Sequence, residues 1–98
     1  MIEVRRTLEF SKWMGALRDG RAKRTIAARI DRLARGNPGD AKPVGHGVSE
    51  LRVHFGPGYR VYFLQRGNVL IVLLCGGDKS SQGADIKNAQ TLAKGLEE

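Results

Sequence analysis

The apolar positions in the first third of the chain repeat with the period of an α-helix. Over residues 7–17 they fall at i, i+3, i+4 and i+7, and a second helical stripe runs from the break at 19–20 to residue 35. Gly36 suits the C-terminal cap of this second helix, and the turn-forming residues 37–40 end it. Two helices with so short a break should form a hairpin that packs on a flat surface. The two stripes are Phe10, Trp13, Met14 and Leu17, and Ile26, Ile30 and Leu33.

Segments with strand character supply that flat surface. Residues 2–6 are a short strand candidate, and residues 41–49, with two glycines and one proline, are expected to be a loop. Three strands are then predicted over 50–55, 59–65 and 69–75. The last of these, VLIVLLC, is apolar on both faces, which favours an interior position in the sheet.

Short connections join the three strands into a meander. Gly56-Pro57-Gly58 fits a type II turn, and Gly67-Asn68 is typical of a tight hairpin. Residues 76–83 are expected to be a loop, after which apolar positions between 86 and 96 predict a final helix. The order β-α-α-β-β-β-α predicts one α+β domain over 1–98, with a helical hairpin and a C-terminal helix packed on a mostly antiparallel four-stranded sheet. With the helices on one face, the opposite face should be free for a site.

Length and composition agree with one globular domain in the cytoplasm. The chain has 98 residues, of which 41% are hydrophobic and 28% charged, and this balance is typical of folded rather than disordered chains. The longest apolar run has seven residues, too few to cross a membrane, and the N-terminus lacks the apolar run of a signal peptide. The single cysteine, Cys75, cannot form an internal disulfide, which fits a reducing compartment.

Charge indicates the class of partner. The net charge is +7 and the sequence pI is about 10.2, values typical of proteins that bind polyanions. The segment 12–35 holds eight Lys/Arg and two Asp, a net +6. Any one of these cations could simply be solvated. The concentration of positive charge in this one segment, however, favours nucleic acid or an acidic protein as the binding partner.

Basic side chains also follow the predicted strands. If the odd-numbered residues of strand 50–55 enter the core, Arg52 and His54 project from the opposite face, and Arg60 and Tyr62 do so from the next strand. Lys79, in the predicted loop after the third strand, could reach the same surface. Arginine pairs with phosphate oxygens through two parallel donors, and tyrosine and histidine offer stacking surfaces for unpaired bases. These residue types predict a phosphodiester-binding site.

RNA could be cleaved at such a site without a metal. Its 2′-OH attacks the adjacent phosphate once a base removes the proton, and an acid protonates the leaving oxygen. His54 is the candidate for proton transfer, whereas His46 lies in a glycine-flanked segment and is taken as incidental. No spacing of carboxylates, histidines or cysteines predicts a metal site, and no cofactor is expected. From the residues alone the prediction is a basic α+β domain that contacts RNA or DNA.

Two segments, ELRVHFGPGYRVYF (50–63) and VLLCGGDKSSQGADIKNAQTLA (72–93), resemble the RelE/ParE toxin superfamily and, within it, the HigB-like addiction module killer proteins. The resemblance implies a RelE-like fold and the toxin of a type II toxin–antitoxin system. The RelE branch is a metal-independent mRNA endonuclease, or mRNA interferase, that acts in the ribosomal A site by 2′-OH attack and so inhibits translation. The resemblance implies that Arg60 and Lys79 belong to the site, together with Arg52 and His54 on the preceding strand. Residues 80–98 lack the tyrosine that RelE carries there, so the acid stays unassigned between His54 and Tyr62.

The resemblance also implies partners. A helix-turn-helix antitoxin would bind and neutralise the toxin, and the basic helices would meet either this antitoxin or ribosomal RNA. The residues expected to contact RNA are Tyr62, Arg29, Arg32 and Lys23. Two alternatives stay open at this point: a ParE-like poison of DNA gyrase, and a non-toxic partner-binding protein.

Overall fold

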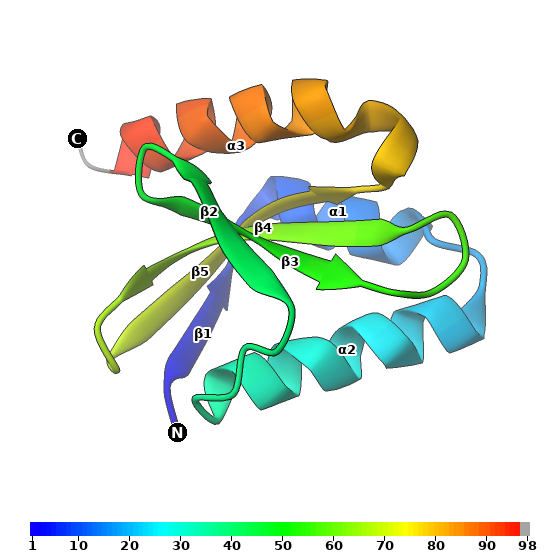
Figure 1. The fold of residues 1–98 in the computed structure, drawn as a ribbon, viewed down its shortest axis with the longest axis horizontal. Coiled ribbons are helices and arrows are strands. Elements are labelled where there is room, and N and C mark those ends of the chain that lie inside the picture. Colours follow the sequence, from blue (N-terminus) through cyan, green and yellow to red (C-terminus); the bar gives the residue numbers. More distant parts are fainter. Residues whose placement is uncertain (97–98) are drawn as a thin grey trace.

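The computed structural model describes residues 1–96 (Figure 1). Its elements, in chain order, are β1 (Glu3–Arg6), α1 (Leu8–Ala16), α2 (Gly20–Ala34), β2 (Ala41–Gly45), β3 (Val48–Val53), β4 (Tyr59–Arg66), β5 (Leu70–Gly77), the 3₁₀ turn η1 (Lys79–Ser81) and α3 (Gln82–Leu96). The five strands form one sheet in the order β1-β5-β4-β3-β2. β1 runs parallel to β5, and the other neighbours are antiparallel. The predicted α+β class and RelE-like arrangement are confirmed, with one strand more than expected.

The additional strand is β2, which the sequence predicted as loop. It pairs antiparallel with β3, with Lys42 opposite Glu50, and the register shifts between Pro43 and Gly45. Proline and glycine weaken strand propensity, but an edge strand tolerates both because one side of it needs no ladder bonds. The prediction of a loop over 41–49 is therefore wrong for residues 41–45, and β3 begins two residues earlier than expected, at Val48.

The helical hairpin covers one face of the sheet. Phe10 and Met14 of α1 and Ile26 and Leu33 of α2 are buried against β3, β4 and β5. Thr7 caps the N-terminus of α1, because its side chain accepts a hydrogen bond from the backbone N–H of Phe10. Each helix ends within one residue of its predicted C-terminus, because the apolar stripe and the capping residues indicate the same end point.

The third helix covers the opposite face (Figure 1). Ala89 and Ala93 of α3 pack on Tyr62, Leu64 and other buried residues of the central strands. These strands are apolar on both faces and so require a cover on each side. The expectation that all helices share one face is wrong, but the end of the second face beyond the N-terminus of α3 stays open (Figure 1), where the side chain of Arg52 is 31% exposed.

Two adjacent glycines let the end of β5 pass between α1 and α3. A Cβ atom at Gly76 would overlap the ring of Trp13, and one at Gly77 would overlap the carboxylate of Asp85, both well inside 3.0 Å. The expected loop over 76–83 is therefore wrong: residues 76–77 belong to β5, a 3₁₀ turn follows, and α3 begins at Gln82. This close passage fixes the position of the turn that carries Lys79.

No helix within residues 1–96 combines the length and the apolar character that crossing a membrane requires.

Candidate phosphate-binding site

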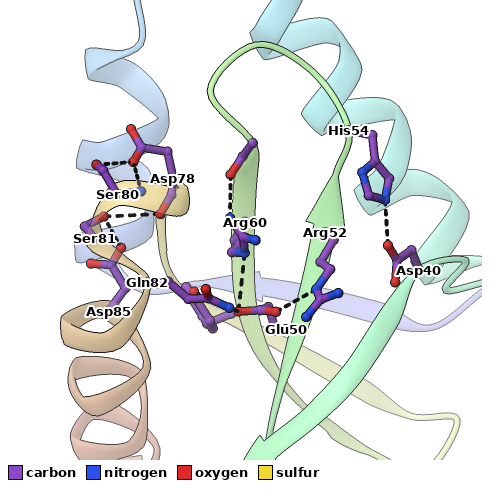
Figure 2. Close-up of polar contacts among 12 residues, drawn as sticks. Asp40, Glu50, Arg52, His54, Arg60, Asp78, Ser80, Ser81, Gln82 and Asp85 are labelled. Atoms are coloured by element: carbon purple, nitrogen blue, oxygen red, sulfur yellow. Dashed lines mark hydrogen bonds and ion pairs between the residues drawn. The ribbon is translucent and has the colours of Figure 1, made fainter.

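Arg52 and Arg60 stand directly opposite each other on β3 and β4, at the open end of the second face. Figure 2 shows both guanidinium groups on the same side of the hairpin. The side chain of Arg52 is 31% exposed and that of Arg60 is 13% exposed. The structure therefore brings together the two arginines that the strand pattern predicted on one face, with Arg52 the more accessible of the two.

A buried carboxylate holds these arginines in place. Glu50 is fully buried and accepts hydrogen bonds from Arg52 Nε at 3.0 Å, Gln82 Nε2 at 2.9 Å and the Tyr62 hydroxyl at 3.1 Å. Arg60 Nε lies 3.6 Å from Glu50 Oε2. Burial by itself would raise the pKa of Glu50, but the hydrogen bonds from Arg52, Gln82 and Tyr62 outweigh it and hold the pKa below its ordinary value. Glu50 is thus a charged anchor beneath the site.

Arg60 keeps part of its hydrogen-bonding capacity unused. Its Nη1 donates to the carbonyl of Gly58 at 2.9 Å, and its buried Nε has no hydrogen-bond partner within residues 1–96. Buried donors are normally paired.

Lys79 lies beside Arg60. A Cβ atom built on Gly58 would be 3.5 Å from both Arg60 Nη1 and Lys79 Cβ, so the β3–β4 turn contacts both side chains. Lys79 itself is exposed. It follows Asp78, whose carboxylate caps the turn by accepting from the backbone N–H of Ser80 at 2.8 Å. The lysine is therefore held on an ordered turn next to the arginine pair.

His54 flanks the arginines on the outer side. It follows the last residue of β3, its side chain is 75% exposed, and Nε2 lies 2.6 Å from Asp40 Oδ2. The hydrogen bond from His54 lowers the pKa of Asp40. In Figure 2 the imidazole turns toward Asp40 and away from Arg60. The ring is thus oriented by a carboxylate and stays open to solvent.

Tyr62 does not reach the exposed surface. It is fully buried beneath α3, its hydroxyl donates to Glu50, and burial raises its pKa well above the ordinary tyrosine range. The expectation that Tyr62 stands on the open face is wrong, because α3 covers this part of the sheet. With neither ring face accessible, Tyr62 can neither stack on a base nor serve as the acid.

The predicted RNA-binding cations of α2 lie on the other face of the sheet. Arg29 is half-buried and donates to the carbonyls of Arg52 and, at 2.9 Å, Pro38. Lys23 donates to the carbonyl of Gly15 at 3.4 Å, and Arg32 is exposed in the last turn of the helix. The structure therefore does not bring these three cations into the group formed by Arg52, Arg60 and Lys79.

Sequence reasoning missed Glu50 and Gln82. Glu50 precedes Arg52 by two residues on the same strand, so both side chains share a face, and in the structure Tyr62 lies opposite Glu50. The spacing of Glu50 and Arg52 was the available signal for an ion pair on this face. No local signal placed Gln82, because its position depends on how α3 crosses the sheet.

The site combines three cations with one shared, buried anion. Such a set can bind a phosphodiester through charge-assisted hydrogen bonds and stabilise negative charge that develops on phosphorus-bound oxygens. Within the part of the chain that the structure describes, no three His, Cys, Asp or Glu side chains are grouped so as to hold a metal ion.

Two comparisons relate the chain to known proteins. Residues 12–96 match the family described as phage derived protein Gp49-like (DUF891). An uncharacterized protein of Haemophilus influenzae (strain ATCC 51907 / DSM 11121 / KW20 / Rd) is 52% identical over 95 residues, which cover 97% of this chain and 96% of the relative. Since the match spans most of the sequence, the chain belongs to the Gp49-like (DUF891) family.

Proposed function

We propose that this Gp49-like protein is the toxin of a type II toxin–antitoxin system and cleaves mRNA on the ribosome. The observation that carries the proposal is the cross-strand pair of Arg52 and Arg60, anchored by buried Glu50 and flanked by exposed Lys79. The resemblance of segments 50–63 and 72–93 to RelE-type toxins gives this basic site its expected substrate.

The site has groups suited to cleavage by the RNA's own 2′-OH. The 2′-oxygen forms a bond to phosphorus while the bond to the 5′-oxygen breaks, which leaves a cyclic phosphate and a free 5′-hydroxyl. Arg52 and Arg60 would stabilise the charge on the phosphoryl oxygens. His54, oriented by Asp40, would accept the 2′ proton, and Lys79, on the turn beside Arg60, would protonate the leaving oxygen.

The proposed partners follow from the same assignment. A helix-turn-helix antitoxin would neutralise the protein, and the exposed cations of α2, such as Arg32, offer a surface for either this antitoxin or ribosomal RNA. Because α2 lies across the sheet from Arg52, contact there would leave the phosphate site open.

Induction of the protein and of matched variants in a bacterial host tests the proposal. The wild type should arrest growth, and mapping of RNA 5′ ends should reveal new cuts within translated regions. Arg52→Gln and Arg60→Gln should each relieve the arrest. Arg66→Gln is the matched control, since Arg66 is exposed at the far end of the same strand.

Folding must be measured alongside toxicity, because both arginines contact Glu50. Circular dichroism and thermal unfolding of each variant separate loss of the site from loss of the fold. Full toxicity in a folded Arg60→Gln protein would contradict the assignment. Intact mRNA together with a DNA damage response would indicate a gyrase poison instead.

A further inference from the structure

A second basic region lies between the β2–β3 turn and α3. It is a cleft of about 630 Å³ lined by His46, Lys87, Gln90, Thr91 and Lys94, which we call the basic cleft. Within residues 1–96, every side chain that lines the cleft carries a hydrogen-bond donor and none is acidic. This described lining can therefore accept an anionic ligand without a competing carboxylate.

The turn that forms one wall of the basic cleft has a fixed and unusual backbone. His46 has a φ of 56° between Gly45 at 98° and Gly47 at 78°, a left-handed conformation that side chains other than glycine rarely adopt. Gln90 Nε2 donates to the carbonyl of Val44 at 2.9 Å and so ties the turn to α3. Figure 1 shows the turn beside the C-terminal half of α3. His46 and Gly47 are the two central residues of a tight hairpin turn, which requires a positive φ at both positions. The turn thus holds His46 beside the helix.

The opposite wall is one stripe of α3. Lys87, Thr91 and Lys94 follow at i, i+4 and i+7, and all three are exposed. The two lysine backbones are separated by about 10 Å along the helix axis. Two cations at this separation, with His46 across from them, suit a ligand whose charges are spread along its length.

The basic cleft is connected to the arginine pair along the β2 edge. Lys42 is exposed and directly opposite Glu50, so it projects from the face that α3 covers. Two residues before Lys42, the carbonyl of Asp40 accepts a hydrogen bond of 2.9 Å from the backbone N–H of Arg52. His46, Lys42 and Arg52 therefore follow one another along the same sheet edge, over about 20 Å.

We propose that the basic cleft binds the phosphate backbone of a single RNA strand that continues from the Arg52–Arg60 site past Lys42. The identity of the strand rests on the proposed function, whereas binding in the cleft requires no cleavage. Phosphate oxygens need only the donors that line the cleft. An acidic protein partner would also need an apolar anchor, and no large apolar side chain lines the cleft.

Equilibrium binding to a single-stranded RNA of about 12 nucleotides, methylated at its 2′-oxygens to prevent cleavage, tests the proposal. Fluorescence anisotropy is measured from about 50 mM to about 200 mM salt for the wild type and for Lys87→Gln/Lys94→Gln. The double variant should bind about tenfold more weakly, and its slope of log affinity against log salt should be shallower by roughly 1.4. The control, Lys12→Gln/Arg18→Gln, removes the same charge from the segment that covers the other face and should change the slope by less than half as much.

The outcomes separate this proposal from the nuclease proposal. Affinity and slope in the cleft variant equal to those of the control would overturn the cleft assignment, even if induction of the wild type cuts mRNA. A specific loss in the cleft variant supports the assignment, even if the wild type cuts none. Polyglutamate that displaces the RNA as well as unlabelled RNA does, at equal charge, would assign the cleft to an acidic protein and overturn the proposal.

Discussion

The carboxylate of Glu50 and the guanidinium of Arg52 form an ion pair of 3.0 Å in which the acid is fully buried and the base is one-third exposed. This arrangement directs the charge of Arg52 outward while its stem is fixed from below. Arg60, 3.6 Å from the same carboxylate, is held in the same way. The positions of both arginines thus depend on one acidic side chain that an RNA substrate could not touch.

Glu50→Gln should lower the free energy of unfolding by about 3 kcal/mol, because it leaves two guanidinium groups without their charged partner. Chemical denaturation measures the change. The same substitution at Glu3, which pairs with Arg5 on the surface at 2.5 Å, should cost no more than about 1 kcal/mol. Equal losses in the two variants would show that Glu50 is not the anchor described above.

The contribution of Glu50 should also depend on pH. Its pKa in the folded protein is below the ordinary value of 4.5, so its stabilisation is fully present above that value and is lost as the pH falls through the lower, folded value. The difference in unfolding free energy between the wild type and Glu50→Gln should therefore shrink as the pH is lowered from about 5 to about 3. Denaturation curves at several pH values measure this difference, and a constant difference would contradict it.

Tyr62→Phe should destabilise the fold without weakening RNA binding. The substitution removes the hydroxyl that donates to Glu50 at 3.1 Å and leaves the buried ring in place, so we expect a loss of about 1 to 2 kcal/mol. The affinity for single-stranded RNA should equal that of the wild type. A clear loss of affinity in a folded Tyr62→Phe protein would indicate that the tyrosine reaches the substrate after all.

Most helices and strands could be predicted, because the apolar pattern of each segment and the turn residues at its ends indicate the same limits. The stripe of Ile26, Ile30 and Leu33 together with the break at 19–20 sets the limits of α2, and alternation with glycine turns sets those of β4. Strand β2 carries a proline and a glycine and depends on β3 for its hydrogen bonds, so it has no local signal of its own. The side of the sheet that α3 covers is also a non-local property.

For the site, strand alternation could predict which side chains share a face of the sheet, but not which of them a helix covers. Alternation and hairpin register placed Arg52 and Arg60 on one face, as the structure has them. The same logic placed Tyr62 on the open surface, because the sequence of two strands does not reveal which helix lies above them. Glu50 was overlooked because a lone carboxylate on a strand is ordinarily exposed.

His54→Asn should lower the rate of mRNA cleavage by about a hundredfold or more while RNA affinity changes little, since the ring is assigned to proton transfer and not to phosphate binding. Asp40→Asn should have a smaller effect, because it removes only the carboxylate that orients the ring at 2.6 Å. Cleavage in a translation extract and anisotropy with methylated RNA measure the two quantities. Wild-type cleavage by His54→Asn would remove the histidine from the mechanism.

Cys75 should be unreactive in the folded protein. Burial raises the pKa of its thiol to about 12, and its side chain lies in the core beneath α3. Since the thiolate is the reactive form, a chromogenic disulfide reagent at mildly alkaline pH should label the native protein about a thousandfold more slowly than the unfolded protein. Ser11→Cys in a Cys75→Ala background places the thiol on exposed α1 and should react at close to the unfolded rate.

Gly77→Ala should destabilise the protein by about 2 kcal/mol or more, because the new Cβ would overlap the carboxylate of Asp85 at the crossing of β5 and α3. Asp85 also accepts a hydrogen bond from Ser81 Oγ at 2.5 Å, so its carboxylate cannot move aside without breaking the turn that carries Lys79. Gly95→Ala is the matched control. It lies in α3 with no atom of the described residues within 4 Å of the added carbon, and alanine there should be neutral or stabilise the helix by up to about 1 kcal/mol. Thermal unfolding of both variants measures the difference, and RNA affinity reports whether the turn has shifted. A Gly77→Ala protein as stable as Gly95→Ala, with unchanged affinity, would mean that the β5–α3 crossing does not fix the position of Lys79.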